Sequence, residues 1–126
     1  IQPGKPVVFG KQPPNTYFFG LPGNPVSTMV TFALFAGPLL RALGGESGCR
    51  PRFGMAQLEE EVRVKAGLTR FLPAHVEGDV RGARVKLVAW QGSGDLTAAA
   101  RANGFLVVPE TTERLVAGQM VSILEI

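Results

Sequence analysis

The segment FFGLPGNPVS, residues 18–27, contains two glycines and two prolines between an aromatic run and a long apolar run. Proline fixes φ and glycine admits conformations that other residues avoid, so such a segment favours one defined corner. Residues 6–10 and 16–20 carry the β-branched and aromatic side chains typical of short strands, and each ends in glycine. We therefore predict two short strands joined by the turn KQPPN, followed by a stiff corner.

The apolar residues after this corner recur at intervals of three and four positions, which predicts a helix over residues 25–43. Pro25 suits the first helical turn, where its missing N–H is not needed, and Asn24 is a favourable N-cap. We expect Pro38 to kink or break the helix and the glycine pair at 44–45 to end it. Because the run is apolar on all sides, we expect the helix to be largely buried.

The composition changes after residue 45. Residues 46–54, ESGCRPRFG, are predicted to form a linker. Residues 55–126 contain several short strand-like segments and one short helical segment, which is typical of a small, mostly β, barrel-like domain. Residues 1–45 have the pattern of the last strand, loop and helix of an α/β domain. The predicted fold is thus an α/β remnant followed by a barrel-like C-terminal domain.

The bulk properties limit the possible functions. The single cysteine, Cys49, excludes an internal disulfide and agrees with a cytoplasmic location. With one histidine, His75, it cannot form a zinc site of the usual spacing. No apolar run reaches the roughly 18–20 residues of a membrane span, so we expect no membrane partner. The net charge of +3 suits an anionic small molecule as well as nucleic acid, and its plain interpretation is solubility. The first residue is not methionine and the pattern begins in mid-fold, so we expect a piece of a longer protein.

The corner has two interpretations. A glycine-rich turn that enters a helix directs backbone N–H groups and the positive end of the helix dipole to one place, where an anion binds well. Gly20 and Gly23 would let a ligand approach the backbone, with Gly23 at a positive φ, and Asn24 and Ser27 would add side-chain donors. The alternative is a rigid corner without a ligand. The segment has neither the Gly-Lys-Ser/Thr end of a P-loop nor the spaced glycines of a dinucleotide fingerprint.

A second glycine-flanked serine lies in QGSGD, residues 91–95, ahead of the predicted short helix at 96–102. It allows the same two interpretations. It is either a small anion site or a turn in which Ser93 or Asp95 caps the helix.

Three motifs occur together in one order: GKP at 4–6, FGLPGNPVS at 19–27 with its long apolar helix, and QGSGD at 91–95 followed by ARANGFLVVP. This arrangement resembles the molybdopterin molybdotransferase family, which also includes the C-terminal portion of gephyrin. The resemblance covers essentially the whole chain, although family members are much longer. It implies that residues 1–45 end the α/β molybdopterin-binding domain and that residues 55–126 form the terminal barrel-like domain.

The resemblance also implies a set of substrate contacts. The family's GLPGNPVS loop lies against the pterin and phosphate side of the substrate and matches residues 20–27 without change. The expected substrate-binding residues are Lys5, Gly20, Pro22, Gly23, Asn24, Pro25, Ser27 and Ser93. Of these, Lys5 corresponds to a lysine of the family's KPGKP turn and Ser93 to the serine of its QGS loop.

Two positions depart from the family pattern. An earlier lysine of the KPGKP turn is Gln2 here, which removes a positive charge from the expected anion site. The arginine expected two residues after Phe71 is Pro73, although Arg70 stands nearby. Whether Arg70 substitutes for it is left open by the sequence.

The activity implied by the resemblance is the insertion of molybdate into adenylyl-molybdopterin, which forms molybdenum cofactor with loss of AMP and with the help of Mg²⁺. A homodimer of the full-length protein is also implied. The family's acidic residues that handle metal and water lie mostly upstream of the matched region, so the catalytic residues stay unassigned. The run EEE at 59–61 could suggest a metal site, but on a strand these side chains alternate between faces. We expect a solvated edge there and no metal ligand.

Two other classes of function are possible. A gephyrin-like module would bind a partner peptide without catalysis, and a long apolar groove between the β unit and the rest would favour it. Nucleic-acid binding would need exposed aromatic side chains on the strands. The β unit carries only Phe71, Trp90 and Phe105, so we expect no nucleic-acid partner.

Overall fold

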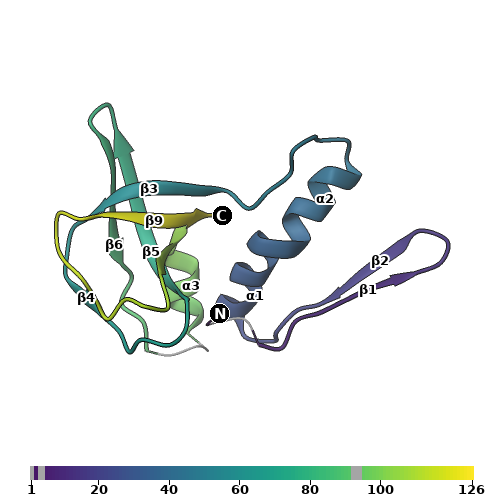
Figure 1. Ribbon diagram of the computed structural model, residues 1–126, viewed down its shortest axis with the longest axis horizontal. Helices are drawn as coiled ribbons and strands as arrows, with labels where there is room; N and C mark the ends of the chain where they lie inside the picture. The colour runs from purple at the N-terminus through teal and green to yellow at the C-terminus, as the bar shows by residue number, and fades with distance from the viewer. Residues whose placement is uncertain (1, 3–4, 92–94) are drawn as a thin grey trace.

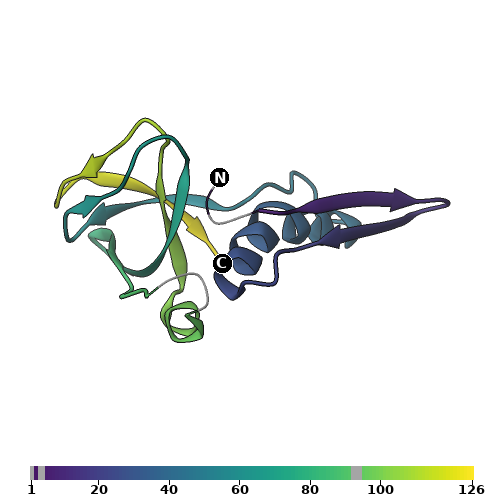
Figure 2. The same cartoon turned by 90° about the horizontal axis from the view of Figure 1, so that it is seen from below.

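The computed structural model describes residues 2, 5–91 and 95–126. A small β-barrel forms one part of the molecule, and a long helix and a β-hairpin form the other (Figure 1). The hairpin projects away from the barrel, and Figure 2 shows the same arrangement from a perpendicular direction. The predicted combination of strand–loop–helix and barrel-like domain is confirmed.

The barrel closes in the strand order β3-β6-β5-β7-β9. The strands are β3 (Phe53–Leu58), β5 (Arg70–Asp79), β6 (Gly82–Leu87), β7 (Gly104–Val108) and β9 (Met120–Glu125). Neighbouring strands are antiparallel except β3 and β6, which run parallel. In β6 the side chains alternate between the two faces of the sheet, since Val85 is buried while Arg84 and Lys86 are exposed. The barrel interior is filled by apolar side chains that include Leu58, Val85 and Leu106.

The two aromatic segments near the N-terminus form a hairpin, as predicted. Strand β1 (Val8–Gln12) pairs antiparallel with β2 (Thr16–Gly20). The rings of Phe9 and Phe19 lie 4.9 Å apart on one face. On the other face the ring of Phe18 covers Gly10, where an added Cβ would lie 2.1 Å from the ring. This contact explains a glycine in the middle of a strand.

The helix runs without interruption from Pro25 to Leu43. It consists of α1 (Pro25–Thr31), a π-helical segment η1 (Phe32–Ala36) and α2 (Gly37–Leu43). The expected break at Pro38 is absent. In the π segment the N–H of Gly37 donates to the carbonyl of Phe32, five residues earlier. This wider turn is the local adjustment that accommodates a proline without ending the helix.

The expectation that the helix is largely buried is wrong for its second half. The first turns pack on the barrel, because Val26 and Val30 are fully buried against Phe71, Phe105 and Leu124. The exposed apolar side chains beyond them are Phe32, Phe35, Leu40 and Leu43. Within the described part of the chain, the barrel covers only one side of the helix. The apolar side chains on its other side are therefore exposed.

The helix has the predicted bounds, Pro25 to Leu43. Its 19 residues are long and apolar enough to cross a membrane, judged by length and composition alone. The expectation that no apolar segment reaches the length of a membrane span is therefore wrong by this criterion, because the helix continues through Pro38. Core helices of soluble proteins have the same length and composition, so this property assigns no membrane location.

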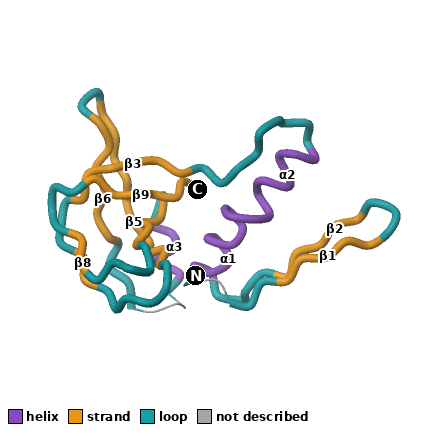
Figure 3. Tube along the Cα trace, in the orientation of Figure 1, coloured by secondary structure: helices purple, strands orange, loops and turns teal. Residues whose placement is uncertain are grey.

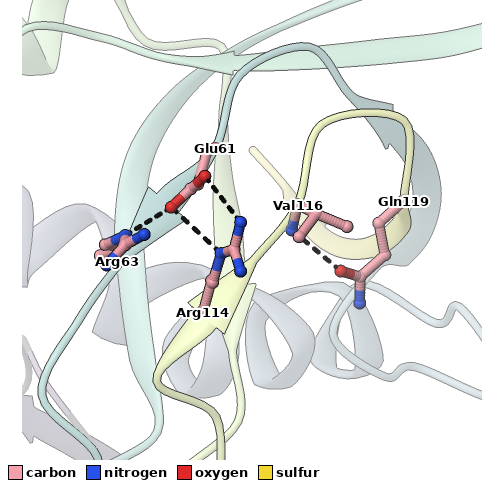
Figure 4. A network of polar contacts seen from close by, with 5 residues as sticks. All are labelled: Glu61, Arg63, Arg114, Val116 and Gln119. Atoms are coloured by element: carbon pink, nitrogen blue, oxygen red, sulfur yellow. Dashed lines mark hydrogen bonds and ion pairs between the residues drawn. The ribbon is translucent and has the colours of Figure 1, made fainter.

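A small two-stranded sheet outside the barrel is held by an ion-pair cluster. Strand β4 (Val62–Arg63) pairs with β8 (Arg114–Leu115). Figure 4 shows the Glu61 carboxylate between two arginines: it contacts Arg63 and lies 3.1 Å from both the Nε and the Nη2 of Arg114. These hydrogen bonds, first from Arg63 and then from Arg114, lower the pKa of Glu61 below its ordinary value of 4.5.

We predict that Glu61→Gln lowers the melting temperature at neutral pH and that this difference disappears in acid. The pKa of Glu61 is lower in the folded state than in the unfolded chain, so its contribution is present above about pH 4.5. That contribution is lost as the pH falls through the folded-state pKa. Thermal unfolding of both proteins between pH 7 and pH 3 measures this. The neighbouring Glu60→Gln is the matched control, and a difference for Glu61→Gln that stays constant with pH would contradict the prediction.

Candidate functional site

The corner between β2 and the helix is fixed by hydrogen bonds from its own side chains. The side chain of Asn24 caps the helix, since its Oδ1 accepts the N–H of Ser27 at 3.2 Å. The hydroxyl of Thr28 lies against the carbonyl oxygens of Pro22 and Asn24, 2.9 Å from the latter. Pro25 occupies the first helical turn, as predicted. The corner is therefore ordered without a ligand, which is the property that a preformed binding loop requires.

The helix cap reduces the number of hydrogen-bond donors that this corner has free for an anion. The N–H of Ser27 is already bonded to Asn24, and the N–H of Thr28 donates to the carbonyl of Asn24 at 2.8 Å. Ser27 is buried, with 6% of its surface exposed. Asn24 and Ser27 thus act first as the cap of the helix. The exposed residues of the corner are Gly20 and Gly23, whereas Pro22 is buried.

The two loop glycines have different environments. Neither Gly20 nor Gly23 has a positive φ, so the expectation of a left-handed Gly23 is wrong. An added Cβ at Gly20 would lie 3.3 Å from the Cβ of Val8, which is a tight contact within the hairpin. An added Cβ at Gly23 would meet no atom within 4 Å. Packing therefore contributes to the choice of glycine at position 20 but leaves position 23 unexplained.

The hairpin brings Lys5 to the same end as this corner. Val8 pairs with Gly20 at the end of the ladder, so residues 5–7 and 21–23 leave the hairpin together. Figure 3 shows both connecting segments at this end, near the start of α1. Lys5 is exposed, and it forms no ion pair with any residue that the structure describes.

The structure brings Gln2 and Arg70 into contact. The Nη1 of Arg70 donates to the Oε1 of Gln2 at 2.5 Å, although the two residues are 68 positions apart. Pro73 lies inside β5, buried and paired with Phe105. A side chain at position 73 therefore points away from solvent, whereas Arg70 lies at the start of the strand beside the N-terminal segment.

The third motif leads into α3 (Leu96–Arg101). Of the two predicted caps, Asp95 is confirmed: its Oδ1 accepts the N–H groups of Thr97 and Ala98, each at 3.0 Å. The backbone hydrogen bond from Ala98, followed by that from Gln91, lowers the pKa of the Asp95 carboxyl. The other candidate, Ser93, lies outside the described residues.

The starts of α1 and α3 border one apolar groove of about 510 Å³. Its lining includes Pro25, Thr28, Met29, Phe32, Leu96 and Ala99. The loop at 20–24 leads into α1 and the QGSGD segment leads into α3, and both helices line this groove. This brings together two motifs that are separated by most of the barrel sequence.

Sequence reasoning missed Thr28 and the link between Gln2 and Arg70. A threonine in the first turns of a helix often bonds back to a carbonyl four residues earlier, and that signal could have identified Thr28. The spacing of Gln2 and Arg70 along the chain gives no such signal, because only the tertiary fold joins them.

The residues that the structure describes hold no cluster of ligands for the magnesium ion that the resemblance implies. Within residues 2, 5–91 and 95–126, no group of three or more His, Cys, Asp or Glu side chains could hold a metal. In the EEE run, Glu61 is engaged by two arginines and Glu59 lies 3.9 Å from Arg84. The described residues therefore do not fit a bound Mg²⁺.

Comparison with known proteins agrees with these features. Residues 55–126 match the family described as the MoeA C-terminal region (domain IV). The molybdopterin molybdenumtransferase of Haemophilus influenzae is 34% identical over 128 residues, which cover 98% of this chain and 31% of that protein. The molybdenum cofactor synthesis protein cinnamon of Drosophila melanogaster is 54% identical over 50 residues, or 40% of this chain and 8% of that protein.

The fold is similar to solved structures of the same kind. The crystal structure of a molybdopterin biosynthesis MoeA protein from Pyrococcus horikoshii matches with a TM-score of 0.72 and 38% identity, covering 98% of this chain and 29% of that one. A molybdenum cofactor biosynthesis protein from Pyrococcus furiosus matches with a TM-score of 0.67 and 26% identity, over 99% of this chain and 42% of that one. The chain thus spans less than half of each of these relatives. Because the matched region is more than half of the chain and contains all of the barrel except the first two residues of β3, this chain belongs to the MoeA family, and its residues 55–126 match the C-terminal region of that family.

Proposed function

We propose that the chain binds the anionic end of molybdopterin as part of an enzyme that inserts molybdate into adenylyl-molybdopterin. The products are molybdenum cofactor and AMP. The observation that carries the proposal is the open backbone at Gly23, in an ordered corner at the same end of the hairpin as Lys5, which forms no ion pair with a described residue. A fixed loop with accessible backbone and a nearby cation suits a phosphate-bearing ligand.

The chemistry of insertion belongs to the complete protein. This chain supplies cations and a rigid loop, and none of its described carboxylates is gathered for acid–base or metal work. Its part in the reaction is to bind and orient the substrate while residues elsewhere in the full-length protein act on it. We also propose that the full-length enzyme is a cytoplasmic homodimer, which the single cysteine and the family resemblance support.

Peptide binding is a second candidate, and one observation favours it. An apolar groove of about 380 Å³ separates the helix from the end of the barrel. Its lining includes Met29, Phe32, Ala33, Pro38, Leu40 and Ile126, with Arg41, Arg52 and Glu125 also at the groove. Such a surface can receive the apolar side chains of a partner segment.

We predict that Gly23→Ala lowers the rate of molybdenum insertion without lowering stability. The added methyl group meets no protein atom and the φ is ordinary, so the fold tolerates it and gains up to about 1 kcal/mol from a stiffer unfolded chain. A substrate that lies against this backbone would be displaced.

The matched control is Gly78→Ala in β5, where an added Cβ also meets no atom within 4 Å. Melting temperature and insertion rate are measured on both full-length variants. If Gly23→Ala inserts molybdenum as fast as Gly78→Ala, the corner is not a substrate surface.

We predict that Lys5→Ala weakens the binding of molybdopterin by about 1–2 kcal/mol, the range for one charge-assisted hydrogen bond. Stability should change little, since Lys5 is exposed and forms no ion pair with a described residue. Titration calorimetry of the full-length protein gives the dissociation constant. Lys11→Ala, at the far end of the hairpin, is the control for charge alone. An unaltered dissociation constant for Lys5→Ala would remove this residue from the site.

The second candidate predicts a different result. Substitution of Leu40 by Asp would abolish capture of a partner peptide while leaving molybdenum insertion intact, because Leu40 lines the apolar groove in α2 and lies about four turns along the helix from the corner. Pull-down and insertion assays on one variant test both functions. Equal loss of both activities would show that Leu40 supports the fold and would count against a separate peptide site.

A further inference from the structure

Asn103 joins the end of α3 to strand β5 by three hydrogen bonds. Its backbone N–H donates to the carbonyl of Ala74 at 3.1 Å. Its side-chain Oδ1 accepts the N–H of Val76 at 2.7 Å, and its Nδ2 donates to the carbonyl of Val76 at 2.8 Å. The side-chain amide thus forms the two bonds that a paired residue of a neighbouring strand would form. We call this pair of side-chain bonds the Asn103 clamp.

The residue that follows the clamp is a glycine for a packing reason. Gly104 is buried in β7, where it is paired with both β5 and β9. An added Cβ would lie 3.2 Å from the carbonyl oxygen of Leu124 and 3.2 Å from the Cγ2 of Val76, and both contacts are tight. The closed barrel therefore favours an Asn-Gly pair at this position.

An Asn-Gly pair is chemically the most reactive context for an asparagine, because glycine has no side chain to hinder attack by its own nitrogen. The backbone nitrogen of Gly104 would bond to the Cγ of Asn103. The bond between Cγ and Nδ2 would break, and ammonia would leave with the proton of the attacking N–H. Water would then open the resulting cyclic imide at one of its two carbonyl carbons to give aspartate or isoaspartate, with no electron gained or lost.

The other two asparagines of the chain lack this context. Asn24 is followed by Pro25, whose nitrogen carries no proton. Asn15 is followed by Thr16, whose branched side chain hinders attack. Spontaneous deamidation is therefore expected first at Asn103.

We propose that Asn103 is a deamidation site that the folded barrel protects through the clamp, and that its deamidation releases α3 from β5. While the clamp is closed, the amide of Asn103 is bonded to Val76 and the nitrogen of Gly104 is fixed in β7. The nitrogen reaches the Cγ only after the strands open locally. The rate of modification therefore depends on how often this part of the barrel opens.

The product cannot form the clamp again. A carboxylate only accepts hydrogen bonds, so the oxygen that replaces Nδ2 would face the carbonyl oxygen of Val76. Isoaspartate also lengthens the main chain by one carbon directly before the buried Gly104. Because α3 ends just before the clamp, either product loosens the attachment of the helix that follows the QGSGD segment.

The first experiment measures deamidation in the full-length protein. The protein is kept in mildly alkaline buffer, either folded or unfolded in urea, and the peptide that contains Asn103 is analysed by mass spectrometry and by isoaspartyl methyltransferase labelling. We expect the folded protein to react at Asn103 at least about tenfold more slowly than the unfolded protein, because only the locally open state reacts. Equal rates, or no reaction in either state, would overturn the proposal.

The second experiment measures the structural effect of the product with Asn103→Asp. Asn15→Asp is the matched control, because it adds the same charge at an exposed residue of the hairpin turn. We expect hydrogen exchange across α3 and the start of β7 to be at least about tenfold faster in Asn103→Asp than in the wild type, and unchanged in Asn15→Asp.

Unchanged exchange in Asn103→Asp would show that α3 does not depend on the clamp, and the proposal would be wrong. If this variant does not fold, the same comparison is made on wild-type protein that has deamidated during storage and has been separated from unmodified protein by ion exchange. Faster exchange of α3 in that fraction supports the proposal, and equal exchange in the two fractions overturns it.

Discussion

The packing of Val26 and Val30 on the barrel holds the two halves of this molecule together. Both side chains are fully buried against aromatic and aliphatic residues of β5, β7 and β9. Burial of such side chains is worth about 1.5–3 kcal/mol each, which is enough to fix the first turns of the helix. Because the contact lies at the helix N-terminus, it also fixes the corner that precedes the helix. The position of the candidate site therefore depends on a hydrophobic contact that no substrate touches.

The same contact explains why the first half of the helix is buried and the second half is exposed. Near Val30 the helix rests on the barrel, and further along, Leu40 and Leu43 face solvent with 57% and 60% of their surface exposed. Relatives contain much more chain than is described here. The corner has its cap, its prolines and its barrel contact within the chain itself, so its geometry does not need the exposed half of the helix to be covered.

Local signals in the sequence predicted the elements that local chemistry controls. Asn24 as cap, Pro25 in the first turn and Asp95 as the cap of α3 all follow from rules that act over three or four residues. The continuation of the helix through Pro38 could not be predicted from such local rules. A proline after an apolar helical run is compatible both with a π turn that lets the helix continue and with a break. The exposure of Leu40 depends on which neighbours are present, and the contact of Gln2 with Arg70 depends on the closed barrel. Neither is encoded in a short window of sequence.

The π-helical segment Phe32–Ala36 has a geometric effect on everything that follows it. One additional residue in a turn rotates the rest of a helix by about 100° about its axis. Val26 and Val30 of α1 face the barrel. Because of this rotation, residues that continue the same spacing in α2 face a different direction. This phase shift gives one continuous helix two apolar stripes that point in different directions: one is buried on the barrel, and the other, which includes Leu40 and Leu43, is exposed.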